Sequence, residues 1–203
     1  AMTFAIGGIS FWIPSYMQQR LAIHEGLGPL LVVEYATHVE SVMMREKMAK
    51  LLSTANQTFG VLVVISGIIA TFLGGWLADI LRKRSARGRM LVQAIGLLCG
   101  APFVALCGMT PSVTWLLVAL TFWGFFKGLY DANIFAAVYD VVRPEARGAA
   151  AGLMNTVGWL AGGGTAPLAI GWIAKKESLS LAIAMASTVY IAALNASCIP
   201  MNA

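Results

Sequence analysis

Long apolar stretches, separated by short polar or basic connections, constrain the fold of this chain more than any other feature. A helix needs about 20 mostly apolar residues to cross the hydrocarbon core of a bilayer. Six stretches meet or approach that length: residues 1–17, 57–81, 90–109, 113–142, 148–174 and 179–199. Charged residues make up only 11% of the chain, whereas soluble domains carry about 25%. The sequence therefore predicts an all-α integral membrane protein with six transmembrane helices and the lipid bilayer as a partner.

The chemistry of the polar residues argues against an enzyme, a metal site and a nucleic-acid partner. The net charge is +5, but the basic residues lie in short loops and no nucleic-acid-binding motif is present. Cys99, Cys107 and Cys198 all lie inside apolar stretches, where cysteine usually packs as a small hydrophobe. Ser10 follows two glycines, but a nucleophilic serine needs a nearby base, and both histidines fall in the connection 20–56. We therefore expect no catalytic residue, metal or cofactor.

The basic loops predict how the chain is oriented. Seven basic residues lie in the loops after the second and fourth stretches: Arg82, Lys83, Arg84, Arg87, Arg89, Arg143 and Arg147. Short loops rich in Lys and Arg stay in the cytoplasm. We therefore expect a cytoplasmic C-terminus, an outer loop at 20–56, and a location in a bacterial inner (plasma) membrane.

The later part of the outer loop has two interpretations. Apolar residues recur at roughly helical spacing within residues 39–52, beside Arg45, Glu46, Lys47 and Lys50. This pattern is typical of an amphipathic helix that lies at the membrane interface. It also suits a polar extension of the second transmembrane helix, and the sequence leaves both open.

The six stretches differ in chemistry in an order that occurs twice. The first and fourth carry polar and aromatic residues, the second and fifth are rich in glycine, and the third and sixth contain no charge. Glycine lets membrane helices approach closely, so we expect the second and fifth to pack against other helices. A short similarity supports a repeat, since Gly75-Trp76-Leu77-Ala78-Asp79 and Gly171-Trp172-Ile173-Ala174-Lys175 end these two stretches. Inverted three-helix repeats are common in secondary transporters, and we expect two of them here.

The loop after the second stretch resembles a signature of the major facilitator superfamily: a glycine, three residues, an aspartate and a basic cluster. The matching residues are Gly75, Asp79, Lys83 and Arg84. Ile80 and Arg82 depart from the pattern, standing where a basic residue and a glycine are usual. Residues 143–148 resemble the approach to the family's eleventh helix. The chain thus resembles the C-terminal six-helix half of this family, which implies an N-terminal six-helix half as its missing partner.

Two stretches are similar to one branch of the superfamily. Residues 4–14 and 71–79 resemble the corresponding helices of Spinster-type transporters. The sequence Val157-Gly158-Trp159 departs from animal Spinster proteins, which have a histidine in that region.

Lys127 and Asp131 are the strongest candidates for a functional site. A charge at the centre of a membrane helix costs roughly 2.5–3.5 kcal/mol, and Lys127 lies at the centre of the fourth stretch. Asp131 is one helical turn away on the same face, where the two can pair. The pair either fixes helix packing or lines a cavity, in which Lys127 attracts an anionic group and Asp131 carries a proton. The resemblance favours the cavity, which the family's tenth helix borders.

Five neutral residues are further candidates for binding or coupling: Tyr130, Asn133, Asn155, Trp12 and Tyr16. Tyr130 falls near the face of the charged pair. Asn133 lies about 120° around the helix from the lysine, so it suits a neighbouring helix as well as a ligand. For Asn155, Trp12 and Tyr16, packing and cavity lining both remain open.

The resemblance also implies a conformational role for the cytoplasmic loops. In the family the loop that holds Gly75, Asp79, Lys83 and Arg84 braces one state of the transporter and loosens in the other. Asp140 and Arg147 are candidates for a similar link.

Together these features predict a secondary active transporter of a small organic solute that works by alternating access. Lys127 favours an organic anion, and Asp131 favours proton coupling. A Spinster-like transporter of a lysolipid or another amphipathic molecule is one alternative. A structural or signalling membrane protein that transports nothing is another.

Overall fold

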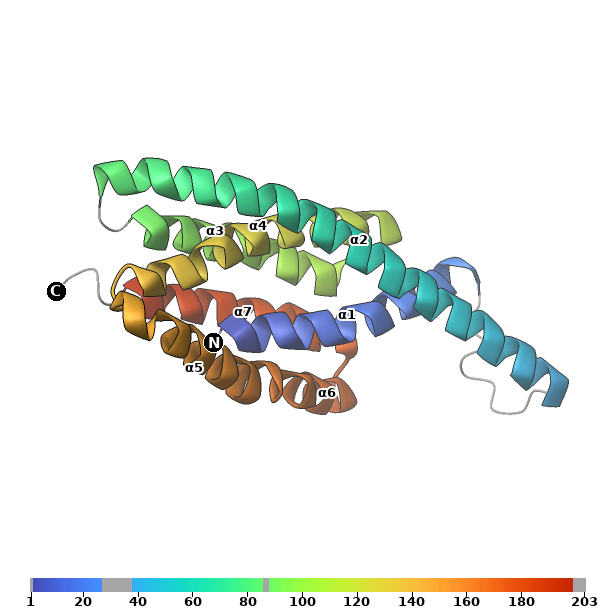
Figure 1. The fold of residues 1–203 in the computed structure, drawn as a ribbon. Coiled ribbons are helices and arrows are strands. Elements are labelled where there is room, and N and C mark those ends of the chain that lie inside the picture. The colour runs from blue at the N-terminus through green and yellow to red at the C-terminus, as the bar shows by residue number, and fades with distance from the viewer. Residues whose placement is uncertain (1, 27–37, 86–87, 199–203) are drawn as a thin grey trace.

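Every regular element in the described part of the chain is helical. The computed structural model describes residues 2–26, 38–85 and 88–198. The α-helices are α1 (Met2–His24), α2 (His38–Arg84), α3 (Gly88–Met109), α4 (Val113–Tyr139), α5 (Arg147–Val157), α6 (Ala166–Lys176) and α7 (Leu179–Cys198). A 3-10 turn (Pro144–Ala146) precedes α5, and a π-helical segment (Gly158–Gly163) leads from α5 toward α6. Because α5, the π-helical segment and α6 follow one another as one interrupted rod (Figure 1), the described residues form six helical rods.

The all-α, six-helix prediction is confirmed, and four of the rods are suited to a bilayer. Over the described residues, four helical segments are long and apolar enough to cross a membrane: Arg45–Arg84, Gly88–Met109, Val113–Tyr139 and Pro144–Lys176. That α1 and α7 also cross the bilayer stays a prediction.

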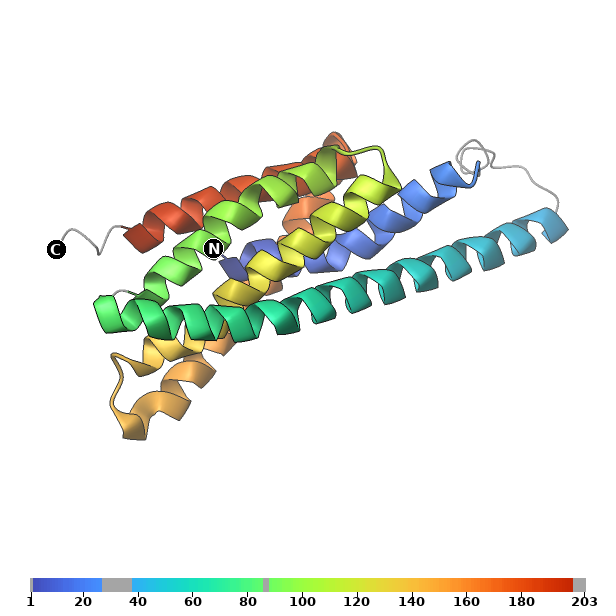
Figure 2. The ribbon, with the colours of Figure 1, turned by 90° about the horizontal axis from the view of Figure 1, so that it is seen from above.

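The longest helix decides between the two interpretations of residues 39–52. α2 is continuous from His38 to Arg84, 47 residues, so this segment extends the second helix and is not a separate helix. At 1.5 Å per residue α2 is about 70 Å long, more than twice the hydrocarbon thickness of about 30 Å. We call residues 38–56 the arm; its first part projects beyond the bundle (Figure 2), and its last part packs against the bundle, where Leu51 and Ala55 are buried. Gln18 Nε2 on α1 donates a hydrogen bond of 2.7 Å to Met48 O of the arm.

α4 lies at the centre of the bundle. It packs against α2 on one side and α3 on the other, and α3 in turn packs against α7 (Figure 2). α1 crosses the remaining face and contacts α2, α6, α7 and the π-helical segment. Trp123 of α4 and Tyr190 of α7 are each 1% exposed, and Trp123 Nε1 donates a hydrogen bond of 2.6 Å to Tyr190 OH. This bond joins the two helices inside the core.

Small residues allow two of these helix contacts to be close. A Cβ atom built on Gly128 of α4 would lie 2.8 Å from Gly67 O of α2. A Cβ atom on Gly7 of α1 would lie 2.7 Å from Gly163 Cα in the π-helical segment. No side chain fits at such distances, so both crossings require glycine.

The predicted packing of the glycine-rich helices is met at some positions. A Cβ atom on Gly74 would lie 3.1 Å from Leu129 Cα, and one on Gly162 would lie 3.0 Å from Phe4 N. A Cβ atom on Gly60 or Gly75 would have no atom of another helix within 4 Å. The similar sequences that end α2 and α6 lie at opposite ends of the bundle (Figure 1), as an inverted repeat requires; the repeat itself stays a prediction.

Candidate functional site

Lys127 and Asp131 form an ion pair on α4. Lys127 Nζ donates a hydrogen bond to Asp131 Oδ2 across one helical turn. The side chains are 22% and 39% exposed, so neither is sealed in the core. Among the described residues, Asp131 is the one carboxylate within ion-pair distance of Lys127. Each charge therefore has the other as its electrostatic partner at this depth of the bundle.

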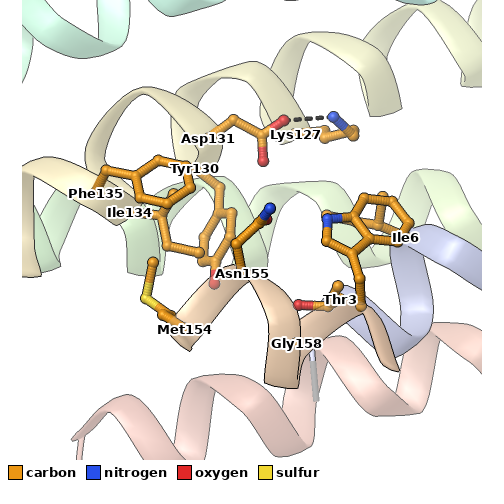
Figure 3. Close-up of a pocket in the computed structure, with 11 residues that line it drawn as sticks. Thr3, Ile6, Lys127, Tyr130, Asp131, Ile134, Phe135, Met154, Asn155 and Gly158 are labelled. Atoms are coloured by element: carbon orange, nitrogen blue, oxygen red, sulfur yellow. Dashed lines mark hydrogen bonds and ion pairs between the residues drawn. The ribbon is translucent and has the colours of Figure 1, made fainter. Parts of the chain in front are cut away.

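A pocket of about 140 Å³ lies on one side of the pair. α4 contributes Tyr130 together with the pair, and α1 contributes Thr3 and Ile6. Asn155 of α5 rises toward Asp131 across the pocket (Figure 3). Gly158 and Trp159, at the start of the π-helical segment, complete the wall. The pocket thus places an amide and a phenol beside the two charges.

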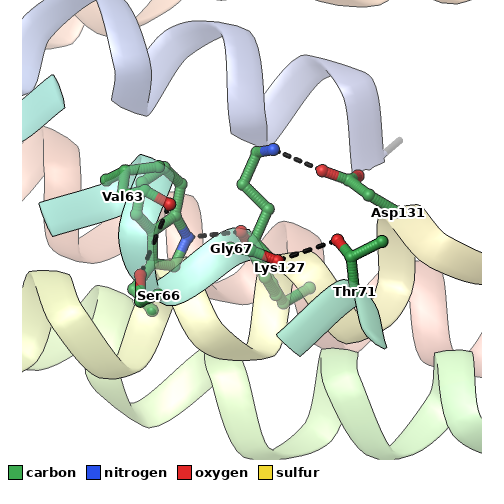
Figure 4. Close-up of polar contacts among 8 residues, drawn as sticks. Val63, Ser66, Gly67, Thr71, Lys127 and Asp131 are labelled. Atoms are coloured by element: carbon green, nitrogen blue, oxygen red, sulfur yellow. Dashed lines mark hydrogen bonds and ion pairs between the residues drawn. The ribbon is translucent and has the colours of Figure 1, made fainter. Parts of the chain in front are cut away.

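A larger groove of about 550 Å³ lies on the other side of the pair, between α2 and α4. Lys127 extends past Gly67 and Thr71 of α2 (Figure 4). Thr71 Oγ1 donates its hydrogen to Gly67 O at 2.8 Å, so the hydroxyl proton already has an acceptor. The rest of the α2 wall is apolar, formed by Val63, Val64, Ile68 and Phe72. The ion pair therefore stands between two mainly apolar spaces, of which the pocket also holds the amide of Asn155 and the phenol of Tyr130.

Asn133 lies outside both spaces. Its side chain is 1% exposed, and its Nδ2 donates hydrogen bonds to Gly74 O of α2 at 3.2 Å and to Leu129 O at 3.1 Å. Of the two roles that the sequence left open, these contacts favour helix packing.

Trp12 and Tyr16 also lie away from the ion pair. Trp12 Nε1 donates a hydrogen bond of 2.9 Å to Pro167 O and so joins α1 to α6. Tyr16 OH lies 3.1 Å from Gly108 O and accepts a hydrogen bond of 2.7 Å from Arg20 Nη2. Of the predicted binding residues, the structure thus brings together Lys127, Asp131, Tyr130 and Asn155, and separates Asn133, Trp12 and Tyr16 from them.

The predicted conformational residues only partly gather. Asp140, just after α4, lies 3.0 Å from Arg82 Nη1 of α2 and 3.1 Å from Arg89 Nε of α3. Asp79 lies 3.6 Å from Arg89 Nη2. We call Asp79, Arg82, Arg89 and Asp140 the charge cluster; it joins three helices at one end of the bundle. Lys83 and Arg84 are exposed beside it.

The expected Asp140–Arg147 link is not formed. The guanidinium of Arg147 lies 5.9 Å from the ring centroid of Tyr139, because the chain turns through the 3-10 segment after α4, while Asp140 contacts Arg82 and Arg89. The sequence showed both arginines as members of a basic loop but not as partners of Asp140. Asp140 is about 50 residues or more away from both arginines in the sequence, so no local sequence pattern indicates the contact.

Asp140→Asn should destabilise the bundle more than Asp79→Asn. Asp140 is 28% exposed and shared by two arginines, whereas Asp79 is 68% exposed and 3.6 Å from the nearest guanidinium. We expect a loss of about 1 kcal/mol for Asp140→Asn and a change within about 0.5 kcal/mol for Asp79→Asn. Thermal unfolding in detergent, followed by circular dichroism, measures both. Equal shifts would show that Asp140 is not the centre of the cluster.

Comparison with known proteins identifies the fold family. The sequence profile of the Major Facilitator Superfamily matches residues 3–201. The chain belongs to this superfamily. Major facilitators are membrane transporters and not enzymes, which agrees with the membrane-length helices of the structure.

Relatives within the superfamily carry two kinds of name. Human "Protein spinster homolog 3" is 30% identical over 177 residues, 85% of this chain and 31% of the relative. Its zebrafish (Danio rerio) counterpart is 28% identical over 186 residues, 89% of this chain and 33% of the relative. A "Probable 4-methylmuconolactone transporter" of Cupriavidus pinatubonensis (strain JMP 134 / LMG 1197) is 32% identical over 126 residues, 61% of this chain and 29% of the relative. No solved structure matches the chain.

Two facts follow for this major facilitator chain. The similarity to Spinster proteins, which the sequence showed in two helices, is confirmed and extends over most of the chain. The chain spans about a third of the length of the curated relatives that it matches.

Proposed function

We propose that this chain is the C-terminal six-helix half of a secondary active transporter that carries a small organic anion together with a proton. The observation that supports this proposal is the ion pair between Lys127 and Asp131, partly exposed to a pocket on one side and a groove on the other. An ion pair that only held helices together would be expected to lie buried between them, whereas this pair borders two open spaces.

The proposed coupling follows from competition for Lys127. While Asp131 is ionised, its carboxylate is paired with the ammonium group of Lys127. Proton uptake neutralises Asp131 and releases Lys127, which then binds the anionic group of the substrate. A partly buried charge without a partner is unfavourable, so the anion and the proton each make binding of the other easier. The site is neutral both when empty and when it holds one proton and one monovalent anion.

Tyr130 and Asn155 would complete the substrate site. Both lie on the pocket side of the pair, where a phenol and an amide can hydrogen-bond the uncharged part of a substrate. Alternating access would come from rocking of this half against an N-terminal half around the site. The charge cluster would hold one of the two states.

We place the charge cluster on the cytoplasmic side, because its loop is rich in Arg and Lys. The same rule puts the C-terminus in the cytoplasm and the arm outside. A bacterial plasma membrane is the proposed location.

An amphipathic substrate such as a lysolipid is the second candidate. The groove of about 550 Å³ beside Lys127 has an apolar α2 wall, which suits an acyl chain whose anionic group contacts the lysine. Relatives named spinster homolog 3 cover most of the chain, in agreement with this alternative.

Uptake into proteoliposomes tests both candidates. The chain, joined to an N-terminal half, is reconstituted and given labelled 4-methylmuconolactone, other small carboxylates or a lysophospholipid. For a proton-coupled anion transporter we expect carboxylate uptake to accelerate when the outside is made acid. Uptake of the lysophospholipid alone would favour the second candidate. Equal uptake rates with and without a pH gradient would contradict proton coupling. If none of these solutes were taken up, the proposal itself would be contradicted.

A further inference from the structure

We propose that the groove between α1 and α6 binds an anionic phospholipid. This groove has a volume of about 560 Å³ and lies away from the ion pair, on helices that run side by side (Figure 1). Most of the groove wall is apolar, and one end of the groove is basic. The inference is independent of which solute the protein carries.

The apolar length of the groove suits an acyl chain. Leu168 and Trp172 of α6 are 75% and 61% exposed, and they lie one helical turn apart on the same face. The floor is closed where Trp12 meets α6: its Nε1 bonds Pro167 O, and a Cβ atom on Gly171 would lie 3.0 Å from Trp12 Cζ2. Glycine at 171 thus leaves room for the indole, and the indole holds the two helices at a fixed separation.

The end of the groove is positively charged. Lys175 is exposed and lines it, and Lys176 Nζ lies 3.9 Å from the ring centroid of Trp172. Within the part of the chain that the structure describes, neither of these two lysines is in an ion pair within 4.0 Å. The neighbouring Glu177 leaves this end with net positive charge.

The combination of these two parts matches one ligand. Tryptophan and lysine at the end of a membrane helix lie at the level of lipid headgroups, and lysines near the surface attract anionic lipids. An acyl chain along Leu168 and Trp172 would place a phosphate near Lys175. Lys176, held over the Trp172 ring, would lie beside the same phosphate. A zwitterionic lipid could fill the apolar length but would gain less at the basic end.

Quenching by brominated lipids tests the proposal, because Trp12 and Trp172 both line the groove. The purified protein is placed in phosphatidylcholine nanodiscs that contain either brominated phosphatidylglycerol or brominated phosphatidylcholine. We expect stronger quenching by the phosphatidylglycerol. In Lys175→Gln with Lys176→Gln this preference should fall about fivefold for each lysine, the change that corresponds to about 1 kcal/mol per charge near the surface.

A matched pair of lysines controls for total charge. Lys47 and Lys50 are exposed on the arm, so Lys47→Gln with Lys50→Gln should leave the preference unchanged. Trp12→Phe with Trp172→Phe should remove the part of the quenching that depends on phosphatidylglycerol. Equal quenching by the two lipids, or an equal loss in both lysine variants, would overturn the proposal. Reversal of the quenching by inorganic phosphate at constant ionic strength would also overturn it, since the site would then bind a free anion.

Discussion

Replacing Lys127 by alanine should abolish substrate uptake while the protein still folds and inserts. The change removes the cation that we propose attracts the anionic group, and it leaves Asp131 free to become neutral by taking up a proton. We expect loss of the charge contact at this partly buried site to cost about 2 kcal/mol, which corresponds to a fall in uptake of about 30-fold. Initial uptake rates in proteoliposomes with equal protein content measure this effect, and circular dichroism checks the fold.

A double variant separates a substrate site from a structural pair. Lys127→Ala with Asp131→Asn removes both charges, and a neutral replacement of an ion pair is often tolerated by the fold. If the pair only holds helices together, the double variant should recover uptake. If Lys127 binds the substrate, the double variant should be well folded and inactive. Recovery of near-normal uptake would remove both residues from the proposed site.

Gly128→Ala should lower the stability of the bundle, because the added methyl group overpacks the crossing of α2 and α4. The added Cβ would lie 2.8 Å from Gly67 O and 2.8 Å from Ala70 Cβ, so α2 and α4 must move apart. Overpacking of this kind costs about 1–3 kcal/mol, which corresponds to a melting temperature about 2–12 °C lower for a chain of this size. Thermal unfolding in detergent or nanodiscs measures the shift.

Gly60→Ala is the matched control on α2. A Cβ atom there meets no atom of another helix within 4 Å, and alanine favours a helix over glycine by up to about 1 kcal/mol. The melting temperature should therefore stay unchanged or rise. If both variants lowered it equally, close packing of α2 on α4 would not be the cause.

The sequence was sufficient for features that depend on local spacing and composition. Membrane-length apolar stretches predicted the helices, and an i, i+4 spacing predicted that Lys127 and Asp131 could pair, as they do. The outer end of the second helix could not be predicted in the same way. A polar helical segment looks alike whether it lies on a membrane or continues a transmembrane helix, and only the structure shows α2 unbroken from His38.

Features that depend on contacts between distant helices were beyond the sequence. The partner of Asn133 is a backbone carbonyl of α2, 59 residues away, and Asp140 contacts arginines on two other helices. The π-helical segment at Gly158–Gly163 also escaped prediction. Its glycines indicated close packing, but glycine-rich α-helix and π-helix share the same composition.

The unbroken course of α2 makes the arm a lever. No break separates residues 38–56 from the apolar part of the same helix, so a change of helix angle within the bilayer is transmitted to the tip. For 19 residues, about 28 Å of helix, a tilt of about 10° displaces the tip by about 5 Å. In the transport cycle that we propose, a tilt of α2 beside Lys127 would therefore move the tip of the arm farther than the part of α2 beside the ion pair.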